Sequence, residues 1–493
     1  MKILIVKNNI FEKLFMFIFV IDINIIINSV CILIMNELEN IIDTIVVQDE
    51  AFFNEEEELE MYITCLHIME HFIHNNPKII TEPEFNDIFD DNICTLMHAN
   101  FEDHLFYTED AEDEMEIIIE HAKQDFFDTF IPPRHHPISI ILNTTKDHVP
   151  HYLHKLKNMY QPEQRTPDWY TYRHNLITAS NAYKAFETPA TQNQLIYEKC
   201  QPILNTYLDA NSVTEPQLVN TSSPLHWGQK YEPLSVQIYE STYNTKIDDF
   251  GCIKHDNYRF LGASPDGINV EPNSERYGRL LEIKNTVSRE IDGVPKKEYW
   301  IQMQLQMEVC NLDECDFLET KFTEYMTHSD FQTDSQPNNI CISLDGKTKG
   351  IIIHFHTIST GKPLYIYKPL DIITETECTH WCQTIIEEYR HKLDYSFITY
   401  LYWKLEVNSC VLVVRNKKWF ADNVPELESI WDTIEKERVE GYQHRAPNRK
   451  PKKDNDTIVS VEEHQGCLLT FNKIIKIQVD KIDSCMDDTT NEH

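Results

Sequence analysis

The pattern of apolar and polar positions divides the chain into a helical first part and a mixed second part. Apolar residues recur at helical spacing in residues 57–76 and again in residues 111–130. From residue 165 onward, amphipathic stretches alternate with short apolar runs typical of strands. These strand candidates are residues 248–255, 258–264, 279–285, 316–322 and 350–356. A mixed central sheet flanked by helices accommodates that order, so the pattern predicts an α/β (α+β) fold.

Changes in composition along the chain suggest the domain boundaries. The acidic stretches lie before residue 122, and proline and histidine mark the segment that follows the helical part. The last segment is polar and basic, so we expect it to be largely disordered. The expected parts are a hydrophobic leader over 1–34, an acidic helical region over 35–130, a linker over 131–164, the main domain over 165–400, a C-terminal extension packed on its core over 401–440, and a basic tail over 441–493.

The hydrophobic leader has three interpretations. Residues 14–34 are about long enough to span a bilayer, but Asp22, Asn24 and Asn28 are costly in hydrocarbon. Met35 then opens a stretch typical of a folded domain. The leader is therefore an upstream extension that is not part of the working protein, a membrane anchor, or a signal peptide.

The net charge and the cysteine content bear on nucleic-acid binding and on the compartment in which the protein works. The formal net charge is -36, from 80 acidic and 44 basic residues, and taken whole this charge argues against a nucleic-acid binder, whose usual footprint is basic. The 13 cysteines are odd in number and contain no CxxC pair. This usage is typical of reduced thiols, so we expect an intracellular protein.

Four chemically reactive side chains follow one another in a suggestive order. Glu232 lies on an expected helix, and Asp266 lies in a Pro-Asp-Gly turn after an apolar run. Glu282 and Lys284 are two positions apart on an expected strand, so both point to the same face. A hairpin from the turn to this strand would bring Asp266 beside Glu282. Each group alone is commonplace, because Pro-Asp-Gly is an ordinary turn and a Glu-Lys pair often lies on a solvated face.

Together these groups are suited to phosphodiester hydrolysis with a divalent cation. We expect the ion to be coordinated by Asp266, Glu282 and the backbone carbonyl of Ile283. Mg²⁺ keeps several of its waters, so few protein ligands suffice, and Mn²⁺ is the expected substitute. Lys284 would lie beside the attacking water and stabilise negative charge. Glu232 would bind a second ion or hydrogen-bond the water.

Five stretches in this order resemble the lambda exonuclease family, also called YqaJ-type viral recombinase nucleases, of the PD-(D/E)xK superfamily. The resemblance covers roughly residues 165–325 and implies a restriction-endonuclease-like core in a large-DNA-virus member of the family. It also implies a Mg²⁺-dependent exonuclease that degrades duplex DNA from its ends, 5′ to 3′, in viral recombination, repair or genome processing. The stretches are LITASNAYKAF, LHWGQKYEP, GASPDGI, LLEIKN and YWIQMQLQMEV.

The resemblance also assigns roles to individual residues. Gln304, rather than Gln302, is expected to hold the nucleophilic water or the scissile phosphate, and Gln302 is assigned to substrate binding. Arg173 and Ser180 match an arginine and a hydroxyl with which the family grips the 5′ phosphate of a DNA end. The expected catalytic residues are Glu232, Asp266, Glu282, Lys284 and Gln304.

The resemblance leaves the biological setting open. The expected partners are double-stranded DNA ends, a single-strand annealing protein and further copies of the chain, with a membrane only if the leader is an anchor. The expected location is the cytoplasm or nucleus of an infected cell. DNA would need a local basic lining, for which the candidates are Arg173, Lys184, Lys254, Arg259 and Lys284. The rival functions are an endonuclease or resolvase-like enzyme on the same fold, and a catalytically silent module whose acidic region binds a basic partner.

Overall fold

A seven-stranded mixed sheet lies at the centre of the structure. The computed structural model describes residues 52–102, 109–142, 144–163, 166–203 and 220–446. The strand order is β2-β5-β6-β7-β10-β8-β9, in which β6 and β7 pair in parallel and the other neighbours are antiparallel. The strands are β2 (Ile247–Asp248), β5 (Gly267–Asn269), β6 (Leu280–Thr286), β7 (Glu314–Tyr325), β8 (Lys349–Thr357), β9 (Pro363–Tyr367) and β10 (Tyr395–Val414). The predicted mixed sheet flanked by helices is confirmed.

A second, three-stranded sheet lies next to the turn that carries Asp266. Its order is β1-β4-β3, formed by β1 (Ile177–Thr178), β3 (Ile253–Lys254) and β4 (Leu261–Ala263). Gly262 of β4 permits a close approach, because a Cβ at this position would lie 2.7 Å from Cδ1 of Leu176. The parallel pairing of β1 with β4 therefore brings the chain near residue 177 beside the turn.

The two faces of β6 contact different helices. Leu281 and Ile283 pack with Tyr239 of α11, while Glu282 between them accepts hydrogen bonds from α12. α11 begins at an N-cap, Ser223, whose hydroxyl accepts a bond from the backbone of His226. The helices from α6 onward are α6 (Val149–Asn158), α7 (Pro167–His174), α8 (Ala179–Ala182), α9 (Pro189–Cys200), α11 (Pro224–Tyr243), α12 (Lys297–Cys310), α13 (His328–Thr333), α14 (Glu375–Arg390) and α15 (Lys417–Glu440), with 3₁₀ turns at Tyr183–Phe186 and Gln443–Arg445.

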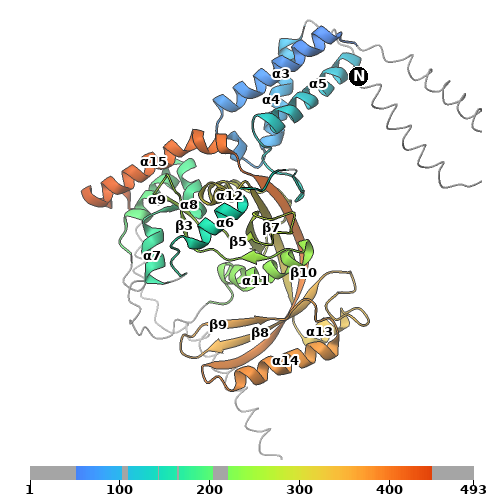
Figure 1. Cartoon of the computed structure of the whole chain (residues 1–493), viewed down its shortest axis with the longest axis vertical. Coiled ribbons are helices and arrows are strands. Elements are labelled where there is room, and N and C mark those ends of the chain that lie inside the picture. The colour runs from blue at the N-terminus through green and yellow to red at the C-terminus, as the bar shows by residue number, and fades with distance from the viewer. Residues whose placement is uncertain (1–51, 103–108, 143, 164–165, 204–219, 447–493) are drawn as a thin grey trace, which may run out of the picture. The chain divides into compact units, whose positions relative to one another are not determined.

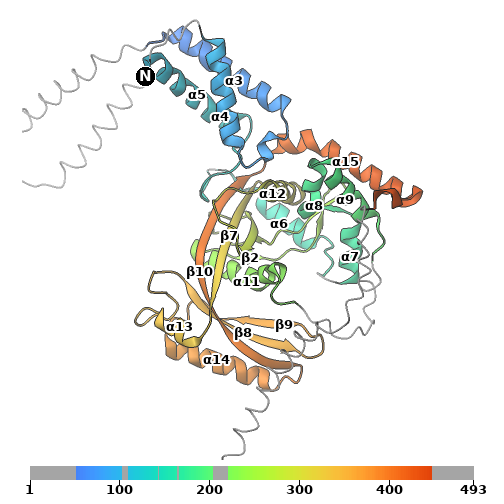
Figure 2. The ribbon, with the colours of Figure 1, turned by 180° about the vertical axis from the view of Figure 1, so that it is seen from behind.

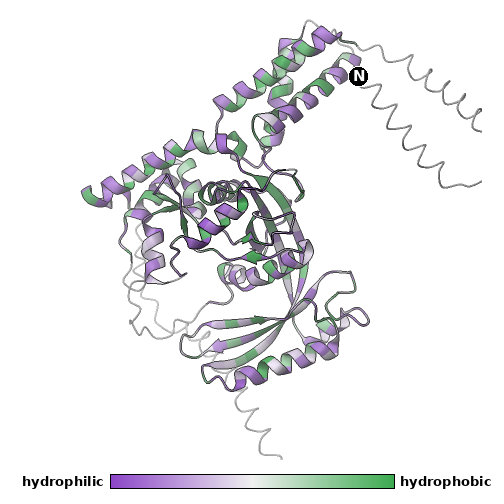
Figure 3. Cartoon of the chain, viewed as in Figure 1, coloured by the Kyte–Doolittle hydropathy of each residue, from purple (hydrophilic) through white to green (hydrophobic). Residues whose placement is uncertain are grey.

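Three acidic helices precede this core. They are α3 (Glu55–Asn75), α4 (Phe85–Asn100) and α5 (Glu109–Thr129), with a short 3₁₀ turn at Ile79–Thr81. A capping box between Asn54 and Glu57 begins α3. Apolar side chains such as Met69, Phe89 and Phe126 are buried between the helices, and polar and apolar positions alternate along all three in Figure 3. The helices thus fall inside the predicted range 35–130, of which residues 35–51 lie outside the described residues.

Two of the expected segments contact or join the sheet. In the expected linker over 131–164, the backbone N–H groups of His136 and Ser139 donate to carbonyls of β10, and α6 forms over Val149–Asn158, within residues 148–160 where the sequence allows one helix. The boundary expected at residue 400 falls inside β10, which lies between β7 and β8 instead of packing on the sheet from outside. β7 and β10 run side by side in both views (Figures 1 and 2). Because β10 pairs with strands that lie far away in sequence, no local pattern distinguishes it from an added segment.

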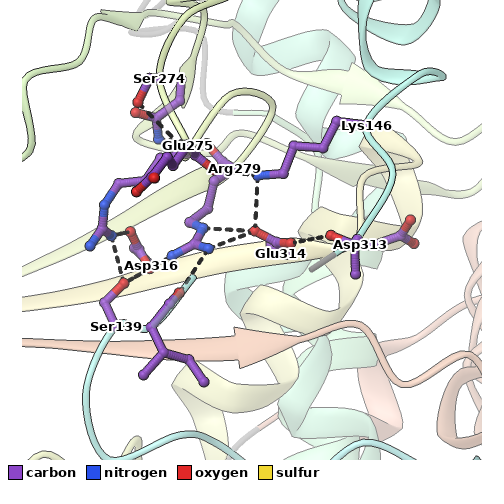
Figure 4. Close-up of polar contacts among 12 residues, drawn as sticks. Ser139, Lys146, Ser274, Glu275, Arg279, Asp313, Glu314 and Asp316 are labelled. Carbon is purple, nitrogen blue, oxygen red and sulfur yellow. Dashed lines mark hydrogen bonds and ion pairs between the residues drawn. The ribbon is translucent and has the colours of Figure 1, made fainter. Parts of the chain in front are cut away.

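A buried network of arginines and carboxylates ties the linker to the sheet (Figure 4). Arg279 donates from Nε to Glu314, at 2.9 Å, and from Nη1 to Asp316, at 3.0 Å. Arg276 forms a second ion pair with Asp316, and Nη1 of Arg279 also donates to the Ser139 hydroxyl. Buried carboxylates and guanidinium groups need such partners, so this network fixes the start of β7 against the loop before β6.

No helix in the described part of the chain is long and apolar enough to cross a membrane. The expected leader over 1–34 lies outside the described residues, as does the expected tail from residue 447 onward.

Candidate active site

Asp266 is held at the end of β4 by the main chain of β6. Its Oδ2 accepts a hydrogen bond from the backbone N–H of Ile283, at 2.7 Å. Gly267 then pairs with Leu281, and a Cβ at Gly267 would lie 2.2 Å from Cγ2 of Ile247. The Pro-Asp-Gly turn is therefore packed against the sheet and fixed in place. Because the N–H and C=O of one residue leave an extended strand on the same edge, the carbonyl of Ile283 also faces the Asp266 side.

Glu282 is fully buried on the α12 face of β6, with 0% of its surface exposed. Its Oε1 accepts from Lys284 Nζ at 2.5 Å and from Gln302 Nε2 at 2.8 Å. Its Oε2 accepts from Gln306 Nε2 at 2.7 Å. Three donors around one carboxylate hold it in a single orientation, as the ligand of a metal ion requires.

The charges of this cluster perturb one another. Burial raises the pKa of Asp266 well above its ordinary value, and the nearby carboxylates of Glu282 and Glu232 raise it further. Burial alone would lower the pKa of Lys284, but the carboxylates of Glu282 and Asp266 outweigh burial and raise it. Lys284 therefore carries a proton, and its ammonium group partly offsets the acidic cluster.

A cavity of about 640 Å³ opens beside Asp266 and collects groups from distant parts of the sequence. Glu232 of α11, Arg173 of α7 and Ser264 line it together with Asp266. Arg173 donates from Nη1 to the Ser264 hydroxyl at 3.4 Å. Its guanidinium lies over the ring of Trp169, 4.7 Å from the centroid, and Trp169 also lines the cavity. The cavity lining thus combines a positioned arginine with four carboxylates, those of Glu163, Glu232, Asp249 and Asp266.

Two cations that the sequence did not indicate hold α7 in place. Lys199 Nζ donates to the carbonyl of Arg173 at 2.9 Å, and Arg438 of α15 donates to the carbonyl of His174, also at 2.9 Å. Burial lowers the pKa of Lys199 to about 8, and the charges of Arg173 and Arg438 add to this shift. Cations at the last carbonyls of a helix stabilise it, so these residues fix the helix that presents Arg173.

Ser180 and Lys184 are not among the residues that line this cavity. Ser180 is exposed at the start of α8, with its hydroxyl 3.3 Å from that of Thr178, and it is not among the residues that line the cavity with Arg173. Lys184 of the expected basic lining donates to Glu198 at 2.8 Å. The hydroxyl that contacts Arg173 is that of Ser264, two residues before Asp266.

The structure also places Gln304 away from the site, which corrects its assignment as a catalytic residue. Its Nε2 donates to the carbonyl of Val414 at 3.0 Å, and its Oε1 accepts from the backbone of Asn416 at 2.7 Å. With 3.6 residues per turn, Gln302 and Gln306 share one face of α12 and Gln304 lies on another. Gln306 was missed, although its four-residue spacing from Gln302 is visible in the sequence.

The oxygen atoms at this site suit a hard divalent cation. Asp266 and Glu282 offer carboxylates, and the Ile283 carbonyl faces the same edge, a donor set typical of Mg²⁺. No group of three or more His, Cys, Asp and Glu side chains placed to share a metal ion occurs in the described ranges. Two carboxylates and a carbonyl fit Mg²⁺ nonetheless, because this ion keeps several waters.

Comparisons with known proteins give one family model, one viral relative and two crystal structures to which this chain is similar. Residues 168–313 match the model of the YqaJ-like viral recombinase domain. An uncharacterized protein of Acanthamoeba polyphaga mimivirus is 30% identical over 309 residues, covering 57% of this chain and 54% of that protein. The chain thus spans about half the length of this curated relative. Crystal structures of an alkaline exonuclease from Laribacter hongkongensis, alone and with dAMP, align with TM-scores of 0.31 and 0.30 at 17% and 16% identity, each covering 55% of this chain and 94% of the exonuclease chain.

Proposed function

We propose that this protein is a metal-dependent deoxyribonuclease that hydrolyses duplex DNA from its ends, because residues 168–313 match the model of the YqaJ-like viral recombinase domain. The proposed direction is 5′ to 3′, and the proposed setting is recombination, repair or genome processing of a large DNA virus. The observation that carries the proposal is the buried carboxylate of Glu282, which is hydrogen-bonded to Lys284 and lies close enough to Asp266 to perturb its pKa.

Mg²⁺ is the proposed cofactor, with Mn²⁺ as a substitute. Asp266, Glu282 and the carbonyl of Ile283 would hold it, and Glu232 would bind a second ion or a water. When bound, such an ion makes a water nucleophilic and neutralises phosphate charge. The raised pKa of Asp266 supports this role, because a cation relieves the repulsion among clustered carboxylates.

The chain's own side chains supply the remaining chemistry. Lys284 keeps its proton beside Glu282, so its ammonium donates hydrogen bonds to phosphate oxygens and stabilises the negative charge that develops during hydrolysis. Gln302 and Gln306 orient the Glu282 carboxylate. Arg173 is proposed to bind the terminal 5′ phosphate in the cavity, with Ser264 beside it and Ser180 as a weaker candidate.

Digestion of end-labelled linear duplex in Mg²⁺, with and without a 5′ phosphate, tests the proposal. We expect mononucleotide release that is faster with the phosphate, and little cutting of closed circular duplex. Lys284→Met should lower the rate about 10²–10⁴-fold, while Lys436→Met, at a 66% exposed lysine of α15, should not change it. Full activity of folded Lys284→Met would refute the assigned site.

Two other outcomes would favour the rival functions. Equal cutting of circular and linear duplex would identify an endonuclease. Absence of cleavage in both Mg²⁺ and Mn²⁺, together with capture of a basic protein through residues 55–129, would identify a catalytically silent binding module. A single-strand annealing protein and further copies of the chain remain the proposed partners of the exonuclease.

A further inference from the structure

A second cation lies just beyond Lys284, on the loop that follows β6. Arg289 donates from Nη2 to Oε1 of Glu319 and from Nη1 to the carbonyl of Glu290, at 3.3 Å. Glu319 lies on β7 directly opposite Lys284 in the parallel register of β6 and β7. Paired residues of neighbouring strands point to the same face, so Arg289 is tethered on the face that carries the catalytic cluster.

The ring of Tyr299 shows how near the two cations are. Lys284 Nζ lies 4.7 Å from the ring centroid, and the guanidinium carbon of Arg289 lies 5.9 Å from it. The two positive groups are therefore no more than about 11 Å apart. Successive nucleotides of one strand advance about 3.4 Å along a duplex axis. The separation of the two cations therefore corresponds to at most about three nucleotides of a strand that runs from Lys284 toward Arg289.

The pair of Arg289 with Glu319 is poorly explained as a device for stability. Glu319 is 1% exposed, and its second oxygen, Oε2, is buried without a hydrogen-bond partner among the described residues. Burial raises the pKa of Glu319 even though Arg289 lowers it, and the nearby charges of Asp292 and Lys296 oppose each other. Buried ion pairs with incomplete hydrogen bonding contribute little net stability. The ion pair with Glu319 does, however, fix the direction in which the guanidinium group of Arg289 points.

We propose that Arg289 binds a backbone phosphate of the DNA strand next to the scissile position, and that Glu319 is its positioning residue. Arg289 has five N–H donors, and its hydrogen bonds to Glu319 and to the carbonyl of Glu290 leave further donors for a phosphate. Its side chain is 23% exposed. This inference rests on the proposed function, because a phosphate track at this place has meaning only if Lys284 meets a DNA strand.

Binding measured at several salt concentrations tests the contact without relying on cleavage. A fluorescent, 5′-phosphorylated duplex is titrated with protein in Ca²⁺, and anisotropy gives Kd between 50 and 200 mM KCl. Loss of one phosphate contact makes the slope of log affinity against log salt shallower by about 0.9. We expect that change in Arg289→Gln and a smaller one in Arg289→Lys. Arg390→Gln, at a 67% exposed arginine of α14, is the matched control and should match the wild type.

The positioning role of Glu319 has its own readout. Glu319→Gln keeps the shape of the side chain and removes a carboxylate whose charged form is disfavoured by burial, which raises its pKa, so the melting temperature at pH 7 should equal or exceed that of the wild type. Its DNA affinity should fall roughly threefold to tenfold, because Arg289 is no longer aimed. A lower melting temperature with unchanged affinity would identify a structural ion pair and overturn the proposal.

The outcomes separate the two proposals. If the wild type neither binds nor cleaves duplex, the proposed function fails and this inference fails with it. If the wild type binds and cleaves but Arg289→Gln keeps the wild-type salt slope, only the inference fails. Should Arg289→Gln not fold, Arg289→Lys decides, because lysine keeps the charge and loses the planar fork.

Discussion

Replacing Gln306 with leucine tests how the acidic cluster is held. The change removes a 2.7 Å bond from Nε2 to Oε2 of Glu282 and a longer contact, of 3.4 Å, to the carbonyl of Ser264. A hydrogen bond to a charged group contributes about 1.5–3 kcal/mol. The substitution also removes Oε1 of Gln306, which is buried and has no hydrogen-bond partner among the residues that the structure describes, and this offsets about 1 kcal/mol. We therefore expect the free energy of unfolding to fall by about 0.5–2 kcal/mol.

The larger effect should be on metal use. Glu282 is a proposed ligand, and loss of a partner that orients a metal ligand typically lowers metal affinity or activity about 10–100-fold. The Mg²⁺ concentration for half-maximal cleavage should rise by that factor in Gln306→Leu. The matched control is Gln304→Leu, which breaks two bonds to Val414 and Asn416 on another face of the same helix. Urea unfolding and initial cleavage rates over a Mg²⁺ series measure both effects.

The two substitutions should differ in their effects on stability and on the Mg²⁺ requirement. Gln304→Leu should destabilise the fold by about 2–4 kcal/mol, because it leaves buried backbone groups unpaired, and it should keep the wild-type Mg²⁺ requirement. A shifted Mg²⁺ requirement in Gln304→Leu, or an unshifted one in Gln306→Leu, would refute the argument that Gln306 orients the metal ligand.

Two further predictions concern buried charge. The pKa of Asp266 is raised in the folded state, so without metal its contribution to stability is full below about pH 4 and is lost as pH rises through the raised pKa. Asp266→Asn should therefore raise the melting temperature of the metal-free protein at pH 7 and flatten its dependence on pH in scanning calorimetry; equal profiles for both proteins would contradict this. Asp316→Ala removes a carboxylate that pairs with both Arg276 and Arg279, so the free energy of unfolding should fall by about 3–5 kcal/mol in urea, and a change below about 1 kcal/mol would show that Glu314 suffices.

The central part of the site could be predicted because its signals are local. Alternation along a strand places Glu282 and Lys284 on one face whatever surrounds the strand. The hairpin from the Pro-Asp-Gly turn brings Asp266 to the same place, because Gly267 pairs with Leu281.

The choice among the three glutamines could not be predicted because α12 is buried on nearly every side. Met303, Gln304, Leu305 and Gln306 are all at most 1% exposed. A helix buried all round has no apolar stripe, so its hydrophobic pattern does not reveal which face meets the active strand. Only the tertiary contacts of β6 and β10 decide this. The role of Ser264 could not be predicted either, because its contact with Arg173 joins segments 91 residues apart.

The placement of β10 has a consequence for how the protein is made. The strand that carries Glu282 and Lys284 leaves the ribosome more than a hundred residues before β10 ends at Val414. Until then β7 lacks its antiparallel neighbour, and Gln304 lacks the carbonyl to which it donates. The nascent chain is thus expected to stay inert toward DNA until translation is nearly finished. A fragment trimmed to residues 168–313 would lack both strands and should not fold by itself.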